Sequence, residues 1–144
     1  MIPADDQTEI DALVAAMFDL FTNADGRPPR VDKARDLFLP GSSIIKNTAA
    51  GPEVYTLERF IETRTAILSD GTLTGFRERE LDTNTEVDGN HAERVCTYTK
   101  SGVLNGVAFT TRGVKVMRLM RTADGWRLTA LAWDDENAAS GPPA

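Results

Sequence analysis

Helical periodicity marks the first half of the chain. From Thr8 to Asn23, apolar residues recur every three or four positions, which predicts an amphipathic helix. A Gly and two Pro at 25–29 end it, and a short second helix is predicted over 31–38. Thr56 is a typical N-cap residue and predicts a third helix that ends at Asp70-Gly71. Between the second and third helices, the β-branched residues of 43–48 predict a short strand.

Strand patterns replace the helical ones after residue 72. We predict four long strands, over 75–87, 91–100, 107–121 and 126–134. Asp-Gly pairs at 88–89 and 124–125 are typical hairpin turns, so the four strands form two hairpins. Residues 1–137 are predicted as a single domain, and 138–144, which lack an apolar pattern, as a terminal tail.

This order of elements predicts an α+β fold in which three helices pack on the concave face of a curved antiparallel sheet. Both the order and the ending Asp-Gly-Trp-Arg-Leu-Thr-Ala-Leu-Ala-Trp-Asp at 124–134 resemble the nuclear transport factor 2-like superfamily, in its SnoaL-like and ketosteroid-isomerase-like branch. The resemblance implies a cone-shaped fold with a pocket between the helices and the sheet. It also implies a convex sheet face that often meets a second copy of the chain.

The composition and net charge of the chain disfavour some classes of binding partner. The chain is 41% hydrophobic and 26% charged, without any apolar run long enough to span a membrane, which is typical of a globular domain. Its 16 Lys and Arg against 22 Asp and Glu give a net charge of -6, which disfavours nucleic acid. The lone Cys96 excludes an internal disulfide, and the N-terminal residues lack a secretion signal pattern, so we expect a cytoplasmic protein.

Strand alternation predicts which side chains face the pocket. If Arg121 pairs with Trp126, the concave face carries Lys115, Met117, Leu119, Leu128, Ala130, Ala132 and Asp134. The same register adds Leu81, Cys96, Tyr98, Phe109 and Thr111. The convex face then holds Val114, Val116, Leu131 and Trp133, which predicts a homodimer through that face. Packing of Trp133 on a flanking loop is the alternative.

A predicted ligand-binding set follows from this assignment: Phe18, Phe60, Arg64, Phe109, Met117, Ala130 and Ala132. Arg64 interrupts the apolar face of the third helix, so its charge needs a partner, and we expect Asp134. The alternative is an Arg64 whose head reaches solvent past the helix edge. Tyr98 is the best-placed hydroxyl, with a core phenol bonded to backbone as the alternative.

Most catalytic constellations are missing from the sequence. A steroid isomerase needs a carboxylate base, a phenol and a second acid. Here the phenol position falls at Met17 or Phe18, residues 44–47 hold no carboxylate where the base would lie, and the second acid position falls near Met117. One His and one Cys cannot form an ordinary zinc site, and no nucleotide-binding motif is present, so no metal or cofactor is predicted. The acidic residues at 5, 6, 9 and 11 are interpreted as a solvated helix start.

Three functions remain open on the sequence alone. The first is a domain that binds a small, largely apolar molecule in the pocket. The second, implied by the resemblance to SnoaL-like cyclases, is a lyase, cyclase or isomerase in which Asp134 is the acid/base and Tyr98 or Arg64 polarises a carbonyl. The third is a non-catalytic dimeric scaffold whose interior is filled by side chains.

Overall fold

The structure, a computed structural model, describes residues 2–136. The predicted tail 138–144 therefore lies outside the described residues. The helical elements are α1 (Ala4–Asp19), η1 (Ala24–Gly26), η2 (Val31–Lys33), α2 (Ala34–Leu37) and α3 (Leu57–Ser69). The strands are β1 (Phe38–Thr48), β2 (Gly51–Tyr55), β3 (Leu73–Asp88), β4 (His91–Leu104), β5 (Val107–Thr122) and β6 (Gly125–Asp135).

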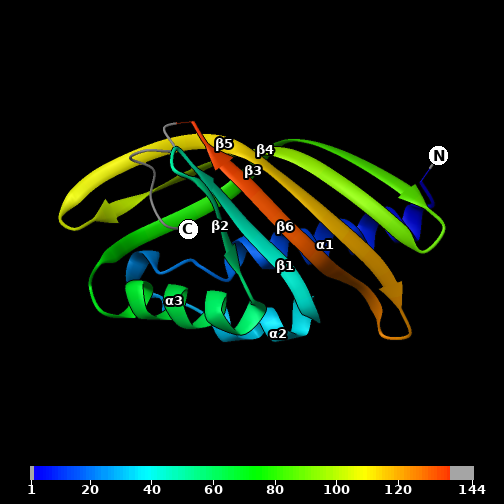
Figure 1. The fold of residues 1–144 in the computed structure, drawn as a ribbon, viewed down its shortest axis with the longest axis horizontal. Helices are drawn as coiled ribbons and strands as arrows, with labels where there is room; N and C mark the ends of the chain where they lie inside the picture. The colour runs from blue at the N-terminus through cyan, green and yellow to red at the C-terminus, as the bar shows by residue number, and fades with distance from the viewer. Residues whose placement is uncertain (1, 137–144) are drawn as a thin grey trace.

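The six strands of the described residues form one curved sheet in the order β2-β1-β6-β5-β4-β3. Figure 1 shows this sheet arching over α1 and α3, which cover its concave face. The predicted α+β fold is therefore confirmed. One pair, β1 with β6, is parallel, and every other neighbouring pair is antiparallel. No helix among residues 2–136 is long and apolar enough to cross a membrane.

Local sequence explains most element boundaries. The Thr56 side chain accepts a hydrogen bond from the Arg59 amide at 3.1 Å, the N-cap that the sequence predicted for α3. Strand β1 begins at Phe38, five residues before the predicted strand. It passes Pro40-Gly41 because Gly41 takes a φ of +81°, and its pairing with β6 shifts between Phe38 and Ser43. Strand β2 was not predicted.

Acidic residues of α1 tie this helix to the sheet. Their interpretation as a solvated helix start was wrong for Asp6, which is buried, whereas Asp5, Glu9 and Asp11 are exposed. Asp6 is buried and accepts hydrogen bonds from the Trp126 indole at 3.1 Å and from Arg121 at 2.7 Å. Glu9 accepts from the Trp126 amide, and Asp11 pairs with the buried Arg94 at 2.7 Å. These contacts fix α1 across the concave face.

A β-bulge in β6 decides which residues face the interior. Arg118 pairs with Ala130 and Leu119 with Leu128, so Thr129 is an extra residue in β6. The Arg121–Trp126 register was predicted correctly, but alternation reverses beyond Thr129. The predicted faces of β6 are therefore wrong from residue 130 onward. The interior carries Leu131, Trp133 and Asp135, and the convex face carries Ala130, Ala132 and Asp134.

Candidate functional site

A group of polar side chains lies on the concave face of the sheet, within the otherwise apolar core. Lys115 forms an ion pair with Glu78 at 3.0 Å, and Lys100 forms one with Asp135 at 3.0 Å. The hydroxyl of Tyr98 donates a hydrogen bond to Asp135. All five side chains are buried, and they come from four adjacent strands, β3 to β6. We call Glu78, Tyr98, Lys100, Lys115 and Asp135 the buried polar cluster.

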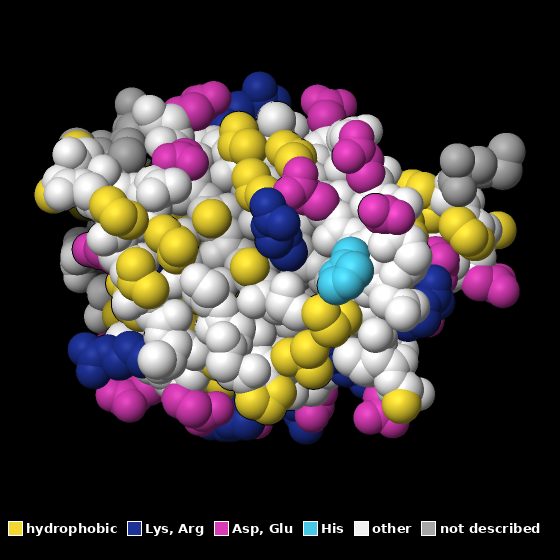
Figure 2. Space-filling model, turned by 45° about the vertical axis from the view of Figure 1, so that its right-hand side comes forward, with side chains coloured by type: hydrophobic (Ala, Val, Ile, Leu, Met, Phe, Trp, Pro, Cys, Tyr) yellow, Lys and Arg dark blue, Asp and Glu magenta, His cyan; other side chains and the backbone are white. Residues whose placement is uncertain are grey.

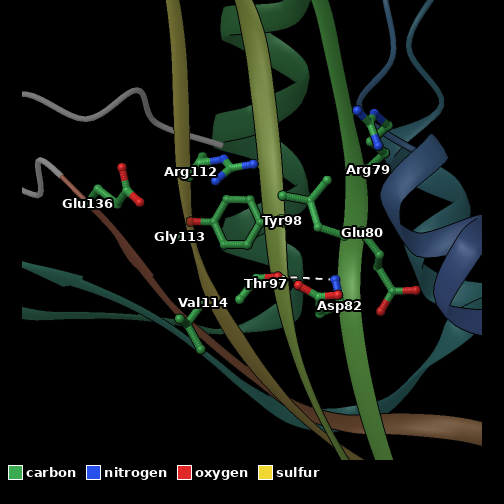
Figure 3. A pocket seen from close by; sticks show the side chains of 10 residues that line it. Arg79, Glu80, Asp82, Thr97, Tyr98, Arg112, Gly113, Val114 and Glu136 are labelled. Carbon is green, nitrogen blue, oxygen red and sulfur yellow. Dashed lines mark hydrogen bonds between the residues drawn. The ribbon is translucent and has the colours of Figure 1, made fainter.

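The missing side chain of Gly113 makes room for the centre of this cluster. Tyr98 on β4 is paired with Gly113 on β5, which in turn is paired with Asp135 on β6. A Cβ at position 113 would lie 2.4 Å from the Tyr98 hydroxyl oxygen and 2.2 Å from the Asp134 carbonyl oxygen. Figure 3 shows the Tyr98 oxygen directed at Gly113. Glycine therefore lets the phenol cross β5 and reach Asp135.

Burial changes the acidity of the cluster. It lowers the pKa of Lys100 to about 8, although Glu78 and Asp135 act in the opposite direction. Burial and the bond to Asp135 raise the pKa of Tyr98, so the phenol keeps its proton. The neighbouring Cys96 has its pKa raised to about 12, also by burial, which leaves an inert thiol. Lys100 therefore loses its proton closer to neutral pH than a lysine in water does.

Arg64 lies among aromatic rings, not beside Asp134. Its guanidinium carbon is 4.7 Å from the Tyr55 ring centroid, 4.9 Å from that of Phe60 and 5.8 Å from that of Trp133. The side chain is buried, so it does not reach past the helix edge. Asp134 lies on the other face of the sheet, where it accepts a hydrogen bond from Asn47 at 3.2 Å. The predicted Arg64–Asp134 pair is therefore wrong.

The other predicted site residues divide between the two faces. Phe18 of α1, Phe60 of α3 and Met117 of β5 are buried in the core, and Phe109 is half-buried and packs on Phe76. Tyr98 is in the interior as predicted, and Lys115 lies 4.5 Å from its ring centroid. The bulge at Thr129 places three predicted residues outside the interior: Ala130, Ala132 and Asp134.

Sequence reasoning missed three members of the cluster: Glu78, Lys100 and Asp135. A signal for Asp135 was present, because Leu131, Trp133 and Asp135 alternate and the first two are large and apolar. Leu128 and Leu131 are three residues apart, a spacing that strict alternation cannot bury and that indicates a bulge. Glu78 and Lys100 gave no comparable signal, because charged residues on a strand usually face solvent.

Two adjoining hollows connect the cluster to the surface. The larger, of about 440 Å³, lies between the end of α1 and strands β3 and β4; the smaller, of about 200 Å³, continues along α1. They share Asp19, Glu78 and Arg79, and we call them together the α1–β3 groove. The remaining lining residues are Ala15, Phe18, Thr22, Arg27, Arg77, Glu80, Thr99, Lys100 and Ser101.

Two further hollows open on the surface, and the first of them shares Arg79 and Glu80 with the groove and also contains Tyr98. One, of about 520 Å³, contains Arg112 and Val114 and is drawn in Figure 3. Another, of about 620 Å³, lies between β1, β2 and the start of α3 and includes Val54 and Tyr55. Neither contains Lys100, Lys115 or Asp135 in its lining. Among residues 2–136 there is also no group of three His, Cys, Asp or Glu placed to hold a metal ion.

Solved structures share this architecture over nearly the whole chain. The Kfla4162 protein of Kribbella flavida superposes with a TM-score of 0.74 at 19% identity, covering 93% of this chain and 95% of that one. A nuclear transport factor 2-like superfamily protein of Salmonella enterica serovar Typhimurium gives 0.74 at 19%, covering 98% and 94%. The fold is nuclear transport factor 2-like.

A proposed dehydratase of the nuclear transport factor 2-like family from Streptomyces avermitilis has the same fold. Its TM-score is 0.72 at 15% identity, with 92% of this chain and 97% of that chain covered. No family model matches the sequence, and no curated protein matches it either. At these identities the nuclear transport factor 2-like fold is what the chains have in common.

Proposed function

We propose that this protein binds a small molecule in the α1–β3 groove, against the buried polar cluster. The observation that carries the proposal is the cluster itself. Burying an ion pair costs several kcal/mol per ion before mutual attraction offsets it, and apolar residues of similar size would often be as stable. Two such pairs beside a groove that reaches Glu78 and Lys100 favour a binding role over a purely structural one.

The protein interior also contains a hydrogen-bond donor without a partner among residues 2–136. The indole N–H of Trp133 is buried and has no hydrogen-bond acceptor among residues 2–136. Its ring lies 4.9 Å from the Lys115 ammonium. Buried polar groups without a partner are rare in native proteins and call for a specific reason. Trp133 lines neither hollow of the groove, so it is the charged side chains that do, Arg79 and Lys100 among them, that favour a ligand with polar atoms over the largely apolar molecule expected from the sequence.

A groove-filling variant tests the proposal. Ala15 is exposed on α1 and lines the groove, so Ala15→Trp should obstruct it. Ala66 is exposed on α3 and lines none of the hollows described above, which makes Ala66→Trp the matched control. A metabolite library would be screened by thermal shift, with hits confirmed by calorimetry. We expect binding to be lost in Ala15→Trp and kept in Ala66→Trp. Hits that tolerate both substitutions would place the binding site elsewhere.

A second candidate, an isomerase or lyase, is favoured by the acidity of Lys100. With a pKa of about 8 it can exchange a proton near neutral pH, and a substrate oxygen that replaced Asp135 as the acceptor would receive the hydrogen bond of Tyr98. Asp135, and not Asp134, is the carboxylate in this arrangement. Ketones and 2-oxo acids incubated in D₂O would be followed by NMR for exchange at the carbon next to the carbonyl. Exchange that persists unchanged in Lys100→Gln would exclude this role.

A further inference from the structure

The α1–β3 groove carries a charge opposite to that of the chain. The larger hollow is lined by four cationic side chains and two carboxylates, a formal charge of +2, and with Glu80 of the smaller hollow the whole groove carries +1, whereas the whole protein carries -6. Both carboxylates are already engaged: Asp19 by Arg27 and Arg30, and Glu78 by Lys115. The smaller hollow adds Glu80, whose two oxygens are held by Arg94. A cleft whose lining carries charge of one sign raises the local concentration of ligands with the opposite charge.

Arg79 stands out among the cations of this groove. Of the twelve arginines in the chain, eight form ion pairs with carboxylates of the described residues. Arg79 is exposed and forms neither an ion pair nor a hydrogen bond with any residue of 2–136. It lines both hollows, at the point where they meet. A guanidinium in this position can offer two parallel N–H donors to one carboxylate.

Hydroxyl groups surround the same space. Thr22, Thr99 and Ser101 line the larger hollow together with Arg79. The Thr99 hydroxyl donates to the Thr111 carbonyl at 3.2 Å, while those of Thr22 and Ser101 bond to no other residue of 2–136. Hydroxyls of this kind donate to the second oxygen of a carboxylate or to a substituent beside it.

We propose that the ligand of the α1–β3 groove is a small organic carboxylate, held by Arg79 with Thr22 and Ser101. This inference rests on the proposed function, because it names the chemical class that the groove takes. Lys100 lies deeper, in its ion pair with Asp135. The organic part of the ligand then extends along α1 toward Ala15 and Phe18.

Matched pairs of acids and amides test the charge class. Benzoate, phenylacetate and hexanoate would be titrated beside their primary amides, which have nearly the same shape and no charge. We expect the acids to bind about tenfold more tightly or better, since hydrogen bonds to a charged group are the stronger ones. Equal affinity of acid and amide would overturn the inference and leave the proposed binding function intact. Tighter binding of inorganic phosphate would overturn it too.

Two arginines provide the matched variants. Arg79 and Arg112 are both exposed, both neighbour Thr99 across the sheet and both lack an ion pair among residues 2–136. Only Arg79 lines the groove. We expect Arg79→Ala to weaken the binding of benzoate about tenfold and Arg112→Ala to leave it unchanged. Equal loss in both variants would locate the anion in the hollow beside Arg112 and refute the proposed site. Should neither acids nor amides bind, the inference fails.

Discussion

Gly113 illustrates how one residue sets the geometry of the cluster. Its φ angle is not in the left-handed region, so conformational entropy alone would let Ala stabilise the chain slightly. The steric contacts decide against it: a Cβ would meet the Tyr98 hydroxyl and the Asp134 carbonyl well inside van der Waals distance. The packing of Tyr98 against the β5 backbone therefore depends on the absence of a single methyl group.

Replacement of Gly113 by Ala should destabilise the fold. We expect Gly113→Ala to lower the free energy of unfolding by about 3 kcal/mol, the upper part of the range for overpacking. Urea denaturation followed by tryptophan fluorescence measures it. Gly102→Ala is the control, because its new Cβ would lie 3.0 Å from the nearest atom instead of 2.2 Å. An equal loss at both positions would mean that the Tyr98 contact is not responsible.

Lys100 should make stability depend on pH in the alkaline range. Its pKa is about 8 in the folded protein and about 10.4 in an unfolded chain. Between these values the unfolded state binds more protons, so the Lys100 contribution to stability rises with pH, by at most about 1.4 kcal/mol per unit. Urea unfolding at pH 7.5, 8.5 and 9.5 would compare wild type with Lys100→Met. We expect the difference to move in favour of the wild type by about 1–2 kcal/mol over that range.

At higher pH, the ionisation of Tyr98 opposes the stabilising effect of Lys100. The raised pKa of Tyr98 means that the unfolded chain loses this phenolic proton first, which lowers stability as the pH passes about 10. A Lys100→Met variant with the same pH profile as the wild type between pH 7.5 and 9.5 would show that Lys100 does not titrate there.

At the scale of elements, Asn23 joins three segments. Its amide nitrogen donates to the carbonyls of Leu68 at 3.0 Å and Leu73 at 2.8 Å, and its amide oxygen accepts from the Phe76 amide at 2.8 Å. The segment between α1 and η1, the end of α3 and the start of β3 are held together in this way. We expect Asn23→Ala to lower the free energy of unfolding by about 3 kcal/mol, because three partners lose their bonds.

Asn84 supplies the control for this prediction. It lies exposed on β3, and its side chain makes no hydrogen bond to the described residues. Asn84→Ala should therefore change the free energy of unfolding by less than about 0.5 kcal/mol. Thermal unfolding of the two variants side by side would separate the cases. A small effect at Asn23 would mean that water replaces the lost side chain.

Elements were more predictable than the orientation of their side chains. Period and turn chemistry located α3 and the four long strands because each has its own local signal, such as Thr56 or Asp88-Gly89. Strand β2 is short and holds Gly51 and Pro52, so it has no period to detect. The inside and the outside of β6 depend on the single bulged residue Thr129, and alternation alone cannot reveal such a break.

At the scale of the whole molecule, the convex face carries an apolar row across five strands. Val54, Ile45, Ala132, Val116 and Val95 are aligned by register from β2 to β4. Val116 and Val95 are each 37% exposed and Val54 is 67% exposed. Figure 2 shows hydrophobic side chains gathered in patches on the side of the molecule that also carries the single histidine. This row replaces the one expected from the sequence, because Leu131 and Trp133 are buried.

The row predicts a homodimer formed through the convex faces. Val116→Glu should split it, because a symmetric contact places the new charge in the interface twice. Val107→Glu, at a 68% exposed position beside the β4–β5 turn, should leave the dimer intact. Light scattering at micromolar concentration distinguishes the two variants. A wild-type protein with the mass of a monomer would exclude this interface.

The position of β6 in the sheet determines when the chain can complete its fold during synthesis. This strand is synthesised after the other five, yet it lies between β1 and β5 in the sheet. Until it arrives, the nascent chain can form only two partial sheets, β1–β2 and β3–β5, each with an unpaired edge. Trp126, which anchors Asp6 of α1, is also missing at that stage. Folding therefore cannot be completed before the last strand is synthesised. A chain truncated before Gly125 would expose unpaired strand edges, which can pair with other chains.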